Sequence, residues 1–190
     1  MLSPAQKNSL IKRVKKIELA RRALHSLSSE ILSASKRAIF AYHRDDKKIA
    51  LQELHEAQKK LRLAARIGQQ EPRVNYDGPW RAAQEEFAEA HLLSQYLHDG
   101  KIGPVPDVSD DPDIFIGALS DLTGELVRHA VRLVTQHKTA AVEQIFKDVD
   151  QVIGFLLQMD LTGNMRTKVD QAKQNLRKLE EMCYELALRR

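Results

Sequence analysis

The chain has 190 residues, 5% of them aromatic, with eight glycines and six prolines. This composition, rich in Ala, Leu, Gln, Lys, Arg and Glu, favours helix over sheet, and the length suits a single domain over residues 1–190. One cysteine excludes an internal disulfide framework, and the lack of an apolar run of ~20 residues or a secretory signal core predicts a cytoplasmic protein without a membrane segment.

The net charge of +4 conceals two halves of opposite sign. Residues 1–73 hold 17 Lys and Arg against seven Asp and Glu, whereas residues 74–190 hold 13 against 19. A basic half indicates a polyanionic partner such as nucleic acid, and an acidic half is able to bind a metal ion. Charge alone leaves open the simpler interpretation that both halves are ordinary solvated helix surfaces.

Apolar residues recur at helical spacing along the chain, and no stretch alternates in polarity as a strand does. The pattern predicts an all-α bundle of six or seven helices. The first helix, from Pro4 to about Tyr42, would be about 57 Å long, which exceeds the needs of a compact monomer and indicates assembly. The other helices are expected over about 46–67, 80–97, 112–138, 139–160 and 165–186, with connectors at 69–79 and 101–112.

Two pairs of carboxylates lie in the acidic half of the chain. Glu86 and Glu89 are three residues apart in the third predicted helix, and each lies beside an apolar position. Asp121 and Glu125 are four residues apart on one face of the fourth helix. If the two helices pack antiparallel, the pairs face one another, and like charges at ~4 Å repel by about 4 kcal/mol at an effective dielectric near ~20. Such a cluster requires protons, arginine partners or a divalent cation, and oxygen ligands favour Mg²⁺, Mn²⁺ or Ca²⁺.

Other interpretations of these carboxylates can be weighed from the sequence. A di-iron centre in a helical bundle uses Glu-x-x-His pairs, and none of the seven histidines has a glutamate three residues before it, which argues against that centre. Ordinary ion pairs of Asp121 with Arg128 or Arg132, on the same helix face, remain open. Gly117 and Gly124 also lie on the Asp121 side, where they would let the third and fourth helices approach closely.

Four segments in order resemble the translin family: SKRAIFAYHR at 35–44, EFAEA at 86–90, DLTGELVR at 121–128 and MCYEL at 182–186. The similarity extends over nearly the whole chain and is greatest to the factor X branch, the catalytic partner in that family. It implies a helical fold that assembles into a closed, hollow, octamer-like shell. It also implies a Mg²⁺-dependent endoribonuclease, with Mn²⁺ as a possible substitute ion, that acts on single-stranded RNA inside the shell.

The resemblance also assigns roles to the acidic residues. The catalytic, metal-binding acids of the factor X branch lie in the segments that contain Glu86, Glu89 and Asp121. Glu125 shares a segment with Asp121 and is expected either to bind the metal or to support its ligands. Plain translin binds single-stranded RNA and DNA without the paired acids of the third helix. The presence of Glu86 and Glu89 therefore favours the nuclease branch.

The chain lacks the basic N-terminal extension and acidic C-terminal tail of eukaryotic factor X, so we expect a homo-oligomer in place of a complex with a separate translin chain. Basic residues are expected to neutralise the RNA backbone. The candidates are Lys36, Arg37, His43 and Arg44 in the first helix and Arg62 and Arg66 in the second. Two further functions stay open: a non-catalytic protein that binds single-stranded RNA or DNA, and a helical scaffold with neither property.

Overall fold

The computed structural model describes residues 1–189, and within that range it contains six α-helices, one 3₁₀ helix and no strand. The helices are α1 Pro4–His43, α2 Lys47–Gln70, η1 Pro72–Tyr76, α3 Gly78–Asp99, α4 Pro112–Thr135, α5 Thr139–Leu156 and α6 Gly163–Leu188. The predicted all-α class and the long first helix are confirmed. None of the helices in the described part of the chain is long and apolar enough to span a membrane.

The structure differs from the prediction in the segment expected as a connector at 69–79. There α2 continues to Gln70 and α3 already begins at Gly78, with η1 between them. Pro72 and Pro79 each lie in the first turn of a helix. A proline fits that turn because its missing N–H needs no partner there and its fixed φ is helical. These prolines therefore begin helices rather than interrupt them.

The turn between α4 and α5 also differs from the prediction. The helix α4 ends at Thr135, earlier than expected, and His137 adopts a φ of +58°. A residue in the left-handed region ends an α-helix and reverses the chain. Lys138 then occupies the N-cap position of α5, so Thr139 is the first residue inside that helix instead of its cap.

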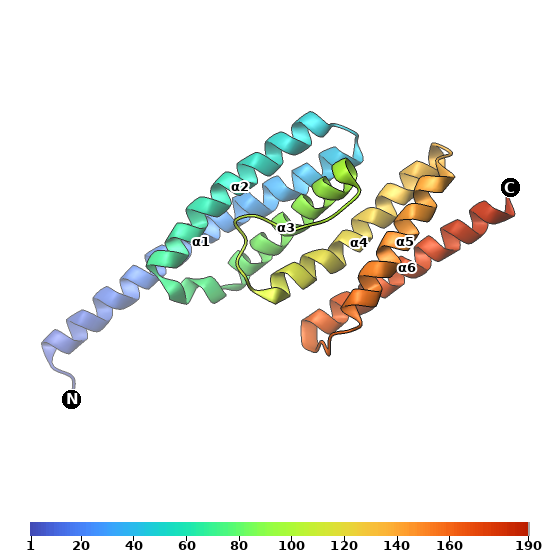
Figure 1. The fold of residues 1–190 in the computed structure, drawn as a ribbon. Helices are drawn as coiled ribbons and strands as arrows, with labels where there is room; N and C mark the ends of the chain where they lie inside the picture. The colour runs from blue at the N-terminus through green and yellow to red at the C-terminus, as the bar shows by residue number, and fades with distance from the viewer. Residues whose placement is uncertain (190) are drawn as a thin grey trace.

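The helices pack in chain order, and α3 lies in the middle of the arrangement. The first helix packs against α2 and α3, α3 packs against α4, and α4 packs against both α5 and α6 (Figure 1). The fully buried side chains come from all of these helices and include Leu24, Leu61, Phe87, Leu122 and Leu179. Because α3 contacts α1, α2 and α4, residues in its middle turns are surrounded by other helices.

The N-terminal part of α1 extends beyond the other helices (Figure 1). Leu24 is the first buried residue of this helix. Before it, Leu10 and Val14, which are four residues apart and so lie on one face of the helix, are 52% and 55% exposed. A single chain therefore leaves these two apolar side chains uncovered.

Candidate functional site

The two predicted pairs of carboxylates influence one another where α3 packs against α4. Burial and neighbouring negative charges raise the pKa of Glu89 to about 9. The charges responsible, in decreasing order, are those of Glu86, Asp121 and Glu125. Burial also raises the pKa of Glu86, and Lys36 opposes this increase. We call the four carboxylates Glu86, Glu89, Asp121 and Glu125 the acidic cluster.

Glu89 is the member of the acidic cluster whose charge is least compensated. It is 9% exposed, and no residue among 1–189 forms a hydrogen bond or an ion pair with its carboxylate. A buried carboxylate without a cation takes up a proton or gains strongly from a bound cation. Burial is the main cause of the raised pKa of Glu89, and the nearby charge of Lys168 offsets the neighbouring negative charges only in part.

A lysine that the sequence patterns did not identify borders the acidic cluster from α6. Lys168 Nζ lies 2.8 Å from Oε1 of Glu85 and also donates a hydrogen bond to Asp121. Burial alone would lower the pKa of Lys168, but the hydrogen bonds to Asp121 and Glu85 raise it above its ordinary value. The ammonium group therefore stays charged and links α6 to both α3 and α4.

Gly117 provides the space in which the Glu85 carboxylate lies. A Cβ atom on Gly117 would be 2.2 Å from Oε2 of Glu85, so the carboxylate occupies the volume that an alanine would fill. At Gly117 the neighbour is thus the end of a side chain of α3, and the predicted close approach of the two helix backbones stays a prediction. Gly124 does not share this role, because its Cβ would face Nδ2 of Asn175 on α6 at 3.4 Å.

Glu125 is held by His43, which the sequence analysis assigned to nucleic-acid binding. The His43 side chain is 4% exposed, and its Nε2 contacts the Glu125 carboxylate. Nη1 of Arg128 lies 3.9 Å from the same carboxylate, and Arg132 donates to the backbone carbonyl of His43. In this structure His43 therefore supports Glu125 from α1 instead of reaching solvent, and Arg128 and Arg132 pair with groups other than Asp121.

The other basic candidates on α1 do not form a single surface. Lys36 Nζ lies 3.9 Å from Oε2 of Glu86 while its side chain remains 61% exposed, so it borders both the acidic cluster and solvent. Arg37 instead binds Glu53 of α2 through two hydrogen bonds of 2.9 and 2.8 Å. Arg44 is exposed at the end of α1. Apart from the buried His43, Lys36 is thus the candidate on α1 that lies beside the acids.

Arg62 and Arg66 belong to a different part of the molecule. Both line a hollow of about 820 Å³ formed by α2, η1, α3 and the loop that precedes α4, which we call the α2–α3 pocket. Nε of Arg62 lies 2.8 Å from Oδ2 of Asp107 in that loop. Neither arginine is among the charges that act on Glu86 or Glu89, so the two arginines are separate from the acidic cluster.

The acidic cluster fits a hard divalent cation by its chemistry. Within residues 1–189, no three His, Cys, Asp or Glu side chains are already arranged to hold a metal ion. Two of the acids are instead beside ammonium groups, Asp121 beside Lys168 and Glu86 beside Lys36. Glu86, Glu89 and Asp121 nevertheless supply only carboxylate oxygens, which Mg²⁺ prefers, and Glu89 has no cation of its own.

Comparison with known proteins gives a family and a set of similar folds. A family model described as the translin family matches residues 7–190. An uncharacterized protein of Methanocaldococcus jannaschii is 29% identical over 171 residues, which cover 86% of this chain and 74% of the relative.

Solved structures share the fold over almost the whole chain. The crystal structure of apo-NeC3PO has a TM-score of 0.86 at 19% identity and covers 97% of this chain and 98% of that chain. The complex of AfC3PO with duplex RNA has a TM-score of 0.87 at 20% identity and covers 96% and 97%. The crystal structure of AfC3PO has a TM-score of 0.86 at 21% identity, again covering 96% and 97%. These TM-scores and coverages show that the chain shares the helical fold of these proteins.

The raised pKa of Glu89 predicts a pH dependence of stability. Its pKa of about 9 in the folded chain exceeds the ordinary value of 4.5, so the folded state binds more protons than the unfolded state between these values. Stability conferred by this group must therefore fall as the pH rises through that window. In EDTA, we expect Glu89→Gln to have a higher melting temperature than the wild type at about pH 8, with a smaller difference at about pH 5. If the difference in melting temperature between the two proteins were the same at both pH values, the burial of an uncompensated Glu89 carboxylate would be contradicted.

The Lys168 contacts predict a loss of stability when the ammonium is removed. Lys168→Met leaves Asp121 and Glu85 without their shared cation, and we expect a loss of about 1–3 kcal/mol in the free energy of unfolding without divalent metal. The matched control is Lys173→Met on the same helix, which removes an ion pair of 3.0 Å with Asp170. Denaturant unfolding should show a loss of less than about 1 kcal/mol for this more exposed pair. Equal losses in the two variants would show that Lys168 does not link the helices.

Proposed function

This chain belongs to the translin family, and from that premise we propose that it is a Mg²⁺-dependent endoribonuclease that cleaves single-stranded RNA inside a hollow homo-oligomer. The observation that supports this best is the acidic cluster, in which Glu89 is buried without a cation between acids from α3 and α4. AfC3PO, which has the same fold, is described in a complex with duplex RNA. That complex supports RNA as the ligand class of this chain.

In the proposed reaction, Glu86, Glu89 and Asp121 hold the metal and Glu125 supports them. A bound Mg²⁺ would supply Lewis-acid polarisation of the phosphodiester and lower the pKa of a coordinated water. Glu125 is suited to a supporting role because His43 and Arg128 already orient its carboxylate. Glu89 is thus the one acid of the cluster that no side chain among residues 1–189 engages, whereas Glu125 is held by two neighbours.

The two lysines beside the cluster have different roles in this proposal. Lys168 occupies the position of a cation between Asp121 and Glu85, so Asp121 becomes available as a ligand only when this contact opens. Lys36 is exposed and contacts Glu86 only at 3.9 Å, so its ammonium group is able to neutralise a phosphate next to the acids. Contacts of this type contribute affinity without sequence preference and weaken with increasing salt.

The second candidate is a non-catalytic protein that binds single-stranded RNA or DNA. It is favoured by the ammonium groups next to Asp121 and Glu86, because they compensate part of the negative charge without any metal. In that case the acidic cluster would serve to hold helices together through Lys168. The two functions differ in turnover, which is directly measurable.

We further propose that the chain forms a homo-oligomer, with the octamer-like shell as the expected form. The support in this structure is the protruding part of α1, on which Leu10 and Val14 are more than half exposed. Exposed apolar residues at helical spacing on an isolated helix are typical of a surface that packs against another helix. Assembly would also enclose the substrate.

Cleavage of a labelled single-stranded RNA, measured with Mg²⁺ or with EDTA, tests the catalytic proposal. We expect Glu86→Ala, Glu89→Gln and Asp121→Asn each to reduce turnover at least ~100-fold, because the metal provides several kcal/mol of transition-state stabilisation. Asp150→Asn is a matched control, since Asp150 is exposed on α5, away from the cluster.

The possible outcomes separate the candidate functions. Salt-sensitive RNA retention without cleavage in Mg²⁺, Mn²⁺ or Ca²⁺ would identify the non-catalytic binding protein. A protein that neither retains nor cleaves RNA would be a scaffold, and filter binding detects this case. Cleavage that persists in all three acidic variants would remove the acidic cluster from the mechanism.

Light scattering coupled to size exclusion tests the assembly. We expect the wild type to elute as an oligomer and Leu10→Asp combined with Val14→Asp to shift toward smaller species, because charged residues cannot be buried in an apolar helix interface without a large cost. Both residues are exposed in the single chain, so helical content by circular dichroism should not change. A wild-type monomer at micromolar concentration would contradict the proposal.

A further inference from the structure

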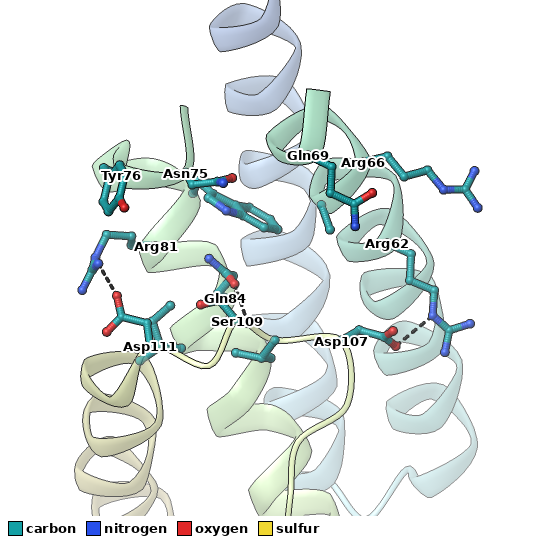
Figure 2. Close-up of a pocket in the computed structure, with 14 residues that line it drawn as sticks. Arg62, Arg66, Gln69, Asn75, Tyr76, Arg81, Gln84, Asp107, Ser109 and Asp111 are labelled. Carbon is teal, nitrogen blue, oxygen red and sulfur yellow. Dashed lines mark hydrogen bonds and ion pairs between the residues drawn. The ribbon is translucent and has the colours of Figure 1, made fainter. Parts of the chain in front are cut away.

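The α2–α3 pocket is a second candidate binding site. Its volume of about 820 Å³ lies within the range of pockets that hold small organic ligands, about 300–1,000 Å³. Figure 2 shows α2 on one side of it, η1 and α3 on the other, and the loop before α4 along its lower edge. Nothing in the proposed nuclease mechanism uses this space.

The loop that forms one wall of the α2–α3 pocket is held on both sides. On the α2 side, Asp107 accepts hydrogen bonds of 2.8 Å from both Gln58 and Arg62. On the α3 side, the backbone N–H of Ser109 donates to Oε1 of Gln84 at 3.0 Å (Figure 2). These contacts form the pocket before any ligand arrives, which lowers the entropic cost of binding.

The lining of the α2–α3 pocket offers carboxamide groups and a buried indole. Gln69 and Asn75 are exposed in its walls, whereas Gln84 is buried (Figure 2). The indole of Trp80, which also lines the pocket, is 4% exposed. The Gln69 carboxamide forms no hydrogen bond within residues 1–189, so it presents a donor and an acceptor side by side, which matches the edge of a nucleobase. The planar apolar indole suits the face of a base.

The rim of the α2–α3 pocket offers a guanidinium group and an exposed ring. Arg66 has no acidic side chain at ion-pair distance within residues 1–189, in contrast to Arg62 and Arg81, which pair with Asp107 and Asp111. Figure 2 shows Arg66 extending outward from α2. Tyr76, on the opposite rim, is 80% exposed. The rim is therefore able to bind a phosphate group with Arg66 and to stack on a ring with Tyr76.

The α2–α3 pocket and the acidic cluster lie on different sides of α3. Gln84 and Glu86 are two residues apart, which places them about 200° apart around the helix axis. We propose that the α2–α3 pocket binds one nucleotide, with the base between Trp80 and the carboxamide of Gln69 and the phosphate at Arg66. The nucleotide comes either from solution or from an RNA strand, and this inference does not depend on nuclease activity.

Trp80 provides a specific signal for the test, because it is the only tryptophan of the chain. We expect AMP and UMP, or a short single-stranded oligonucleotide, to quench its fluorescence in a saturable manner in EDTA, where no metal-dependent cleavage occurs. Arg66→Ala and Gln69→Ala should each weaken the apparent affinity, by about tenfold for the charged contact. Lys59→Ala is the matched control, since Lys59 is an exposed cation of α2 that does not line the pocket. This variant should bind the same ligands with the affinity of the wild type.

The ligands also separate the two possible sources of the nucleotide. Saturation by AMP or UMP identifies a site for free nucleotide, whereas saturation by the oligonucleotide alone identifies a contact with an RNA strand. N-acetyltryptophanamide in the same solutions corrects for light absorbed by the bases. The proposal is wrong if neither ligand gives saturable quenching, or if quenching in Arg66→Ala and Gln69→Ala equals that of the wild type.

Discussion

Negative charge buried between α3 and α4 is the constraint on which the candidate site depends. Glu89 lies in this environment without an ion pair among residues 1–189, and burial and the neighbouring acids raise its pKa. The neighbouring acids meet the same constraint through contacts from other helices, Asp121 through Lys168 of α6 and Glu125 through His43 of α1. The acids of α3 and α4 are therefore compensated by basic side chains from two further helices, α1 and α6.

The central position of α3 gives the molecule two chemically different faces. Toward α4 and α6 this helix presents carboxylates, and Gly117 leaves room for one of them, Glu85. Toward α2 it presents Trp80 and Gln84, which line a polar pocket beneath the loop that precedes α4. The two surfaces share one helix but no side chain. A change in one of them therefore need not alter the other.

The long α1 connects assembly with the site. Its protruding end carries the uncovered apolar residues Leu10 and Val14, while its C-terminal end carries Lys36 and His43 beside the acidic cluster. Because an α-helix is a stiff element, packing of the protruding end against another chain would also set the position of the residues near the acids. Oligomer formation and the geometry of the acidic cluster thus both depend on α1.

The sequence by itself determined the helical class and the spacing of the acids, because apolar periodicity defines helices and i+3 or i+4 spacing places side chains on one face. Only the tertiary structure decided what those faces meet. Lys168 lies 47 residues from Asp121, and no local pattern relates them. The sequence predicts His43 to be an exposed basic residue, whereas in the structure it is buried against Glu125 of α4. Gly124 is predicted to face α3 but faces α6. Periodicity specifies which side of a helix is buried, whereas the partner across each interface depends on how the helices pack.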